Sequence, residues 1–314
     1  MSAGGDGHGN KAVIAALLAN AAIAVAKFVG FLVTGSSAML AESVHSVADS
    51  GNQGLLLLGG KRAKKAADEE HPFGYGRERY FWAFVVALVL FSLGGLFSLY
   101  EGFHKLEESR EGGELNAPGV AIGILLFAAV AEAFSFRTAI VESKKVKGDQ
   151  TWWRFVRTAK SPELPVVLLE DLGALVGLLL ALVGVVLAAV TGDLIWDALG
   201  TMAIGVLLLV IAVFLVIEMK GLLMGEGGTP QDVAKVRAAL VDGSAVTSII
   251  HLKTMHIGPD ELLVAAKIGV SPSLTVAELA AAIDGAEGRV RAAVPLARAI
   301  YLEPDLRREP ATQT

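Results

Sequence analysis

A long apolar stretch near the N-terminus carries ionisable and amide side chains at helical spacing. Between residues 37 and 58 the hydrophobic run is interrupted by Glu42, His45, Asp49, Asn52 and Gln53. At about 100° per residue, positions 42, 45, 49 and 52 share one helix face, and His45 lies one turn from Asp49. An imidazole and a carboxylate that face inward at this spacing supply half of a divalent-metal site. The alternative is a buried polar pair that joins helices, but the cost of such groups at membrane depth favours a functional role.

A second polar intrusion lies in the apolar run PVVLLEDLGALVGLLLALVGVV, at Glu170 and Asp171. If this segment faces the first one, Asp171 completes a site with His45 and Asp49. Adjacent helical residues point about 100° apart, so Glu170 is either a fourth ligand or a nearby proton acceptor. Two carboxylates and one imidazole suit zinc, and an oxygen-rich site also accepts manganese, iron or cobalt.

The composition indicates a membrane protein that passes the bilayer several times. The chain has 314 residues, 54% of them hydrophobic, and a mean hydropathy of +0.57, which is too apolar for one soluble domain of this size. Cysteine is absent, so a metal must be held by nitrogen and oxygen ligands. The net charge is −5 without a basic cluster, which excludes nucleic acid as an expected partner.

Six stretches are long and apolar enough to cross a membrane, and they predict an all-α six-helix transmembrane bundle. They are residues 12–33, 37–58, 81–99, 118–139, 164–190 and 194–217. The connections after the second and fourth stretches are rich in lysine and arginine, whereas the first and fifth connections have none. The positive-inside rule therefore predicts that both termini and the two basic loops are cytosolic.

The pattern changes after Met219 to that of a small cytosolic α+β domain. Thr229 and Thr275 each have an acid three residues later, as at helix N-termini. Strands are predicted at residues 246–256, 261–270 and 297–302, and helices at about 230–240 and 276–293. The order αββαβ predicts a ferredoxin-like open sheet with helices on one face. An exposed face or edge of such a sheet suits pairing with a second copy, so we expect a homodimer.

These patterns predict four segments along the chain: a disordered tail at residues 1–10, a transmembrane domain at 11–218, the cytosolic domain at 219–308, and a C-terminal tail at 309–314. The N-terminal sequence lacks the basic region and small-residue cleavage site of a secretory signal. With short termini and no targeting peptide, we expect a bacterial inner (plasma) membrane rather than an organelle membrane.

Several features together resemble the cation diffusion facilitator family of metal/proton antiporters. They are the H-x-x-x-D at His45 and Asp49, the stretch HPFGYGR that begins at His71, the six spans and the αββαβ domain. The resemblance runs from about Asn10 to Asp305. The Glu-Asp pair of the fifth span, with HPFGYGRERYFW, is similar to the branch that includes the ninth human zinc-transporter-like protein.

The resemblance implies a transport site with two ligands four residues apart on the second helix and two on the fifth. His45 and Asp49 match the first pair, and Asp171 matches the last ligand. The position four residues before Asp171 is Val167, which cannot bind metal. Glu170 is the leading candidate for the fourth ligand. Asn20 and Asn52 are weaker ones.

Further metal sites of the family are expected to be weak or missing. In the connection after the second helix, Asp68 and His71 remain, but Tyr75 stands where relatives have another histidine. In the cytosolic domain, the positions that bind a metal pair in relatives are Ile250, Ala266, Tyr301 and Glu303. We expect His251 and His256, which have opposite strand parity, to be surface residues rather than joint ligands.

Other charged groups within the spans have structural interpretations. Lys27 is expected near the inner half of the first span, from which its long side chain reaches the interface. Glu132 is expected either to pair with Lys27, the commoner role of such groups, or to take part in proton movement. Glu42 is an exit-path acid or a solvated residue at the helix end. Asp193 and Asp197 are expected at a hydrated outer mouth.

The sequence thus predicts a secondary transporter that exports a divalent transition metal in exchange for protons, with zinc first and manganese, iron or cobalt behind it. It is not expected to be an enzyme or to hold a resident cofactor, and it contains no H-E-x-x-H motif. Asp49 and His45 must lose protons to bind metal, which couples the two ions. The alternatives are a passive metal channel and a regulatory scaffold of the same fold that does not transport.

Overall fold

The computed structural model describes residues 21–111 and 115–306. The predicted tails at 1–10 and 309–314 and the start of the first predicted span lie outside these ranges. The chain divides into two compact units, and each is described by itself. The first contains Met1–Gly60 and Phe81–Met219, and the second contains Lys61–Tyr80 and Lys220–Thr314. The segment after the second helix thus belongs with the C-terminal residues.

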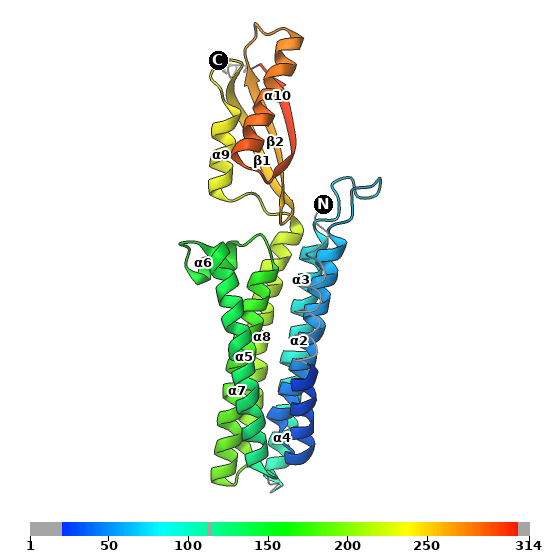
Figure 1. The fold of residues 1–314 in the computed structure, drawn as a ribbon, viewed down its shortest axis with the longest axis vertical. Helices are drawn as coiled ribbons and strands as arrows, with labels where there is room; N and C mark the ends of the chain where they lie inside the picture. The colour runs from blue at the N-terminus through cyan, green and yellow to red at the C-terminus, as the bar shows by residue number, and fades with distance from the viewer. Residues whose placement is uncertain (1–20, 112–114, 307–314) are drawn as a thin grey trace, which may run out of the picture. The chain divides into compact units, whose positions relative to one another are not determined.

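The first unit is a bundle of long helices that run side by side (Figure 1). In chain order they are Ala21–Thr34, α2 (Ser37–Arg62), α3 (Glu78–Val89), the π-helical segment η1 (Leu90–Leu96), α4 (Phe97–Arg110), α5 (Pro118–Lys147), the short α6 (Trp152–Thr158), α7 (Glu163–Thr191) and α8 (Ile195–Met224). The segments α3, η1 and α4 form one continuous helix of 33 residues.

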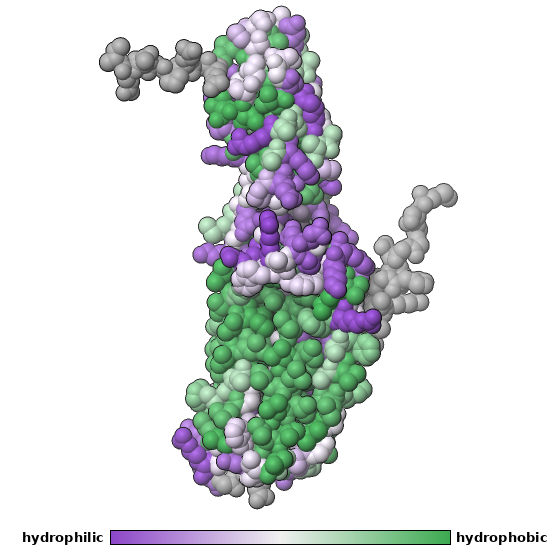
Figure 2. All heavy atoms as spheres, turned by 90° about the vertical axis from the view of Figure 1, so that its left-hand side faces the viewer, coloured by the Kyte–Doolittle hydropathy of each residue, from purple (hydrophilic) through white to green (hydrophobic). Residues whose placement is uncertain are grey.

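Among the described residues of this unit, four helices are long and apolar enough to cross a membrane: Glu78–Arg110, Pro118–Lys147, Glu163–Thr191 and Ile195–Met224. Their outer surface forms a broad hydrophobic region (green in Figure 2), as expected for a multi-pass membrane protein. The 26-residue helix α2 has the length to span, about 39 Å at 1.5 Å per residue. Its polar face lowers its hydropathy, so the six-helix count stays a prediction.

Glycines allow the helix Glu78–Arg110 to pack closely on α8. A Cβ atom on Gly205 would lie 2.9 Å from the backbone nitrogen of Leu99 and 3.0 Å from the carbonyl oxygen of Gly95. A Cβ on Gly102 would lie 2.5 Å from the Met202 side chain. Small residues let helix backbones approach in this way where no water drives apolar association, so these contacts fix α8 against its neighbour.

The start of α2 is held by a carboxylate from α8. Asp197 accepts hydrogen bonds from the Ser36 hydroxyl at 2.7 Å, the Ser37 backbone N–H at 2.8 Å and the Ser37 hydroxyl at 3.1 Å. It thereby satisfies a donor at the helix N-terminus, which has no partner within α2. The prediction of a hydrated mouth is wrong for Asp197, which is fully buried because α2 docks on it, whereas Asp193 is exposed.

The second unit contains a three-stranded sheet with two helices (Figure 1). Its elements are α9 (Pro230–Leu240), β1 (Val246–Gly258), β2 (Glu261–Val270), α10 (Val276–Ala293) and β3 (Ala297–Asp305). This is the predicted order. The strand order is β1-β2-β3, with β1 antiparallel and β3 parallel to β2. Val264 of β2 lies opposite Thr254 of β1 and Ile300 of β3.

The core of this unit lies between the helices and one face of the sheet. Val264 and Ile268, which point to the same face of β2, are buried with Leu240 of α9 and Val290 of α10. Thr275 forms the predicted capping box with Glu278, and Thr229 caps α9 by accepting from the Asp232 N–H.

One of the two strand histidines departs from the prediction. His251 is exposed, but His256 is only 1% exposed, so the surface placement is wrong for His256. The cause is local, because the segment before α9 lies along β1 there and the His256 N–H donates to the carbonyl of Glu226 at 2.8 Å.

Replacing Asp197 should destabilise the bundle. The change Asp197→Ala leaves the buried Ser37 N–H and two hydroxyls without their acceptor, which we expect to cost about 2 kcal/mol of unfolding free energy. Thermal unfolding of the purified protein in detergent checks this. The matched control is Asp149→Ala at an exposed loop position, and equal stability of the two variants would contradict the role of Asp197.

Candidate metal-transport site

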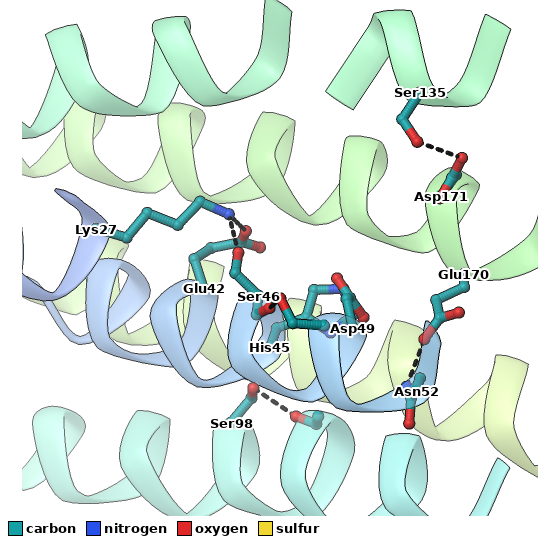
Figure 3. A network of polar contacts seen from close by, with 12 residues as sticks. Lys27, Glu42, His45, Ser46, Asp49, Asn52, Ser98, Ser135, Glu170 and Asp171 are labelled. Carbon is teal, nitrogen blue, oxygen red and sulfur yellow. Dashed lines mark hydrogen bonds and ion pairs between the residues drawn. The ribbon is translucent and has the colours of Figure 1, made fainter. Parts of the chain in front are cut away.

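His45 and Asp49 lie one turn apart on α2 and face each other (Figure 3). The His45 Nε2 atom is 3.5 Å from an Asp49 carboxylate oxygen, and the imidazole is 1% exposed. Within the described residues, neither ring nitrogen of His45 forms a hydrogen bond, and the same holds for the buried Asp49 Oδ1 atom. Buried polar atoms are nearly always hydrogen-bonded. These atoms therefore have the capacity to accept a cation.

Glu170 and Asp171 point to different neighbours from the same turn of α7 (Figure 3). The Asn52 amide of α2 donates a hydrogen bond to Glu170, so this acid reaches toward α2. Asp171 accepts from the Ser135 hydroxyl of α5 at 2.9 Å. The roughly 100° between adjacent helical residues accounts for the difference. Both acids are mostly buried, with 5% of Glu170 and 7% of Asp171 exposed.

A small polar cavity joins these helices. Its lining residues are Ile23, Ser46, Asp49, Gln53, Glu132, Ser135, Val167, Glu170 and Asp171. Three of the four predicted ligands therefore line one cavity. The fourth, His45, is not among the lining residues and lies beside Asp49. In the part of the chain that the structure describes, no three His, Asp or Glu side chains converge closely enough to hold a metal ion. The predicted ligands therefore lie near one another, but they do not form a complete metal-coordination site.

At the position where the family resemblance implies a fourth ligand, the cavity wall is formed by the apolar side chain of Val167. Val167 lies one helical turn from Asp171. Of the substitutes considered from sequence, Asn52 uses its amide on Glu170, and Asn20 lies outside the described residues. Sequence reasoning missed Ser135, which lies three residues after Glu132 on the same face of α5. That spacing was the available signal.

A buried ion pair lies beside the cavity. The Lys27 ammonium is 3.0 Å from the Glu42 carboxylate and donates to the Ser46 hydroxyl at 2.8 Å. Only 2% of Lys27 and 0% of Glu42 are exposed. The predictions that Lys27 reaches the interface and that Glu42 is solvated are therefore wrong. Glu42 on the neighbouring helix offers a counter-charge at the same depth, and buried charges in membranes are paired in this way.

The second predicted site lies at Asp68 and His71 in the loop after α2, where the Asp68 carboxylate already accepts hydrogen bonds from neighbouring groups. The Asp68 carboxylate accepts from the Lys65 ammonium, the Tyr75 hydroxyl and the His71 N–H, each at 2.8 Å. The bond from Lys65, followed by those from Tyr75 and His71, holds the pKa of Asp68 well below its ordinary value. A metal at this position would have to displace the Lys65 ammonium. The weak second site stays a prediction.

The positions of the family's metal pair in the C-terminal unit carry side chains that do not assemble a site. Ile250 and Tyr301 are exposed and Ala266 is buried. Glu303 pairs with Lys267 at 2.9 Å. Among the residues described for this unit, no group of three potential metal ligands is present.

The Lys65 contact makes a prediction for the titration of Asp68. We expect Lys65→Met to raise the pKa of Asp68 toward its ordinary value of about 3.9, as measured by carbon-13 NMR of aspartate-labelled protein in detergent. Because the folded-state pKa is depressed, this contact stabilises the loop above that pH and is lost as the pH falls. The exposed neighbour provides the control Lys64→Met. An ordinary Asp68 pKa in the unmodified protein would contradict the contact.

Comparisons with known proteins agree with these features. Residues 13–224 match the family described as the cation efflux transmembrane domain. Metal tolerance protein C4 of Arabidopsis thaliana is 32% identical over 273 residues, which cover 86% of this chain and 59% of that protein. The mitochondrial proton-coupled zinc antiporter SLC30A9 of Mus musculus is 30% identical over 251 residues, or 79% of this chain and 44% of that protein.

The magnetosome protein MamB of Paramagnetospirillum magneticum is 26% identical over 275 residues, which cover 86% of this chain and 85% of that protein. The chain spans about half the length of the two eukaryotic relatives. The family match covers well over half of the chain and contains every predicted residue of the transport site. The chain therefore belongs to the cation diffusion facilitator family of cation efflux transporters.

Proposed function

We propose that this transporter exports a divalent transition metal in exchange for protons, with zinc as the leading cargo and manganese, iron or cobalt as alternatives. The observation that carries the proposal is the polar cavity inside the helix bundle. There Asp49, backed by His45 on α2, meets Glu170 and Asp171 of α7. The name of the mouse relative, a proton-coupled zinc antiporter, supports both the metal and the counter-ion.

The donor set suits this cargo. An imidazole nitrogen and carboxylate oxygens are ligands for zinc, and the carboxylates also suit manganese. His45, Asp49 and Asp171 are the proposed ligands, with Glu170 as the less certain fourth. A small shift of α7 against α2 would bring the acids of both helices onto one ion. The bond from Asn52 already draws Glu170 in that direction.

Exchange for protons follows from the same groups. A carboxylate or imidazole binds metal only after losing its proton, so metal and protons compete for one cavity. The cavity is enclosed by several helices, which can open it to one side at a time by rocking against each other. Both ions are then carried by alternating occupation of the same side chains, without a continuous pore.

We also propose a homodimer of six-helix subunits in a bacterial inner membrane, with both termini in the cytosol. The lysine-rich and arginine-rich connections after α2 and α5 support this orientation. The relatives include mitochondrial and magnetosome proteins, so the bacterial inner membrane is part of this proposal.

Flux through proteoliposomes tests the proposal. We expect zinc to enter vesicles that contain a fluorescent zinc indicator, with a rate that rises under an imposed pH gradient. Asp49→Ala and Asp171→Ala should each lower the rate by at least about tenfold, because each removes a ligand that no neighbour replaces. The control is Asp284→Ala, at an exposed position of α10, which should leave the rate unchanged.

The other outcomes identify the alternatives. Flux that ignores the pH gradient would overturn the antiporter in favour of a passive channel. Absence of flux with zinc, manganese, iron and cobalt alike would indicate a scaffold that does not transport. Full activity in both ligand variants would show that the metal passes elsewhere.

A further inference from the structure

We propose that Glu132 of α5 contacts the transported metal and adds an oxygen ligand that favours manganese-like cations relative to zinc. This inference rests on the proposed function and adds a third helix to a site otherwise built from α2 and α7. It concerns the position left open by Val167, whose side chain cannot bind metal.

The placement of Glu132 follows from its helix face. Glu132 and Ser135 are three residues apart, so their side chains project from one side of α5. The Ser135 hydroxyl bonds to Asp171 at 2.9 Å, which turns this side of α5 toward α7. Both residues line the same cavity as Asp49 and Asp171. Glu132 is therefore on the cavity wall, and it is partly exposed.

Lys27 does not pair with Glu132. Lys27 was the expected partner of Glu132, but its ammonium lies 3.0 Å from Glu42 and bonds to Ser46. No lysine or arginine occurs among the cavity-lining residues of the described chain. Glu132 forms no hydrogen bond or ion pair with another described residue, so its carboxylate oxygens are available to a cation that enters the cavity.

His45 independently indicates that a cation belongs here. Its imidazole is 1% exposed, and both ring nitrogens lack hydrogen-bond partners among the described residues. The ring faces Asp49, which lines the cavity (Figure 3). A buried imidazole without such partners is costly unless something binds it. The His45 nitrogens thus lie behind Asp49, which forms one wall of the cavity, and Glu132 lies on another wall.

The chemistry of the two donors predicts the effect on selectivity. Imidazole nitrogen suits zinc, whereas carboxylate and carbonyl oxygens suit manganese and other hard cations. Converting the Glu132 carboxylate to an amide removes one charged oxygen and leaves the nitrogen donor in place. The Glu132→Gln change should consequently lower the affinity for manganese more than the affinity for zinc.

The experiment compares Glu132→Gln with the unmodified protein in two assays. These are equilibrium binding of manganese and of zinc to purified protein in detergent, and initial rates of both metals into proteoliposomes. We expect manganese binding to weaken by about tenfold and zinc binding by less than about threefold. Glu132→Asp, which keeps the carboxylate, should retain the original preference.

A matched control lies on the same helix. Glu142 is exposed and pairs with Lys145 near the end of α5, so Glu142→Gln changes the charge of α5 away from the cavity and should leave both affinities unchanged. If Glu132 had a merely structural role, Glu132→Gln would lower the affinities for both metals by the same factor, and this result would overturn the inference. Unchanged affinities in Glu132→Gln would overturn it as well.

Failure of the proposed function would look different. In that case the unmodified protein would move no metal into vesicles, whatever residue is present at position 132. Normal flux in the unmodified protein together with an unaltered manganese-to-zinc ratio in Glu132→Gln would retain the transporter and reject the role of Glu132.

Discussion

Ionisable groups inside a bundle of apolar helices must be paired, hydrogen-bonded or bound to a cation, and the transmembrane unit is arranged around this requirement. Lys27 meets it with Glu42, and Asp197 meets it with the serines at the start of α2. The groups around the cavity meet it only in part. Asp171 has one serine, Glu170 has one amide, and the His45 nitrogens have no hydrogen-bond partner among the described residues.

This difference separates the polar groups that tie helices together from those of the proposed transport site. The Lys27 pair and the Asp197 cap each tie α2 to another helix, and their counter-charges or donors are provided by the protein itself. The incomplete contacts lie further along α2, where it faces the acids of α7 and α5. In the proposed antiporter the binding groups cannot be satisfied permanently by the protein's own side chains, because metal and protons must compete for them.

Apolar packing provides the rigid part of the bundle. Glycines bring α8 against the helix Glu78–Arg110, with spaces too small for a side chain at Gly95 and Gly205. In contrast, the cavity between α2, α5 and α7 is lined mostly by polar and acidic residues. The glycine contacts between α8 and the helix Glu78–Arg110 thus lie apart from the cavity, across which Asn52 bonds to Glu170 and Ser135 bonds to Asp171.

The sequence by itself determined the features that depend on local spacing. The one-turn separation of His45 and Asp49, the caps at Thr229 and Thr275, and the order of elements in the C-terminal unit all follow from residues close in the chain. It also carried the family resemblance, since the H-x-x-x-D and the HPFGYGR stretch are local motifs.

Only the tertiary structure decided which distant groups meet. Glu132 was the expected partner of Lys27, and helix packing selects Glu42 instead. Glu170 and Asp171 are adjacent in sequence, yet one reaches α2 and the other α5. Glu132 faces the cavity, and Asp197 is buried under α2. These outcomes depend on the neighbours and rotation of each helix, which are set by packing between segments far apart in the chain rather than by the period of any one of them.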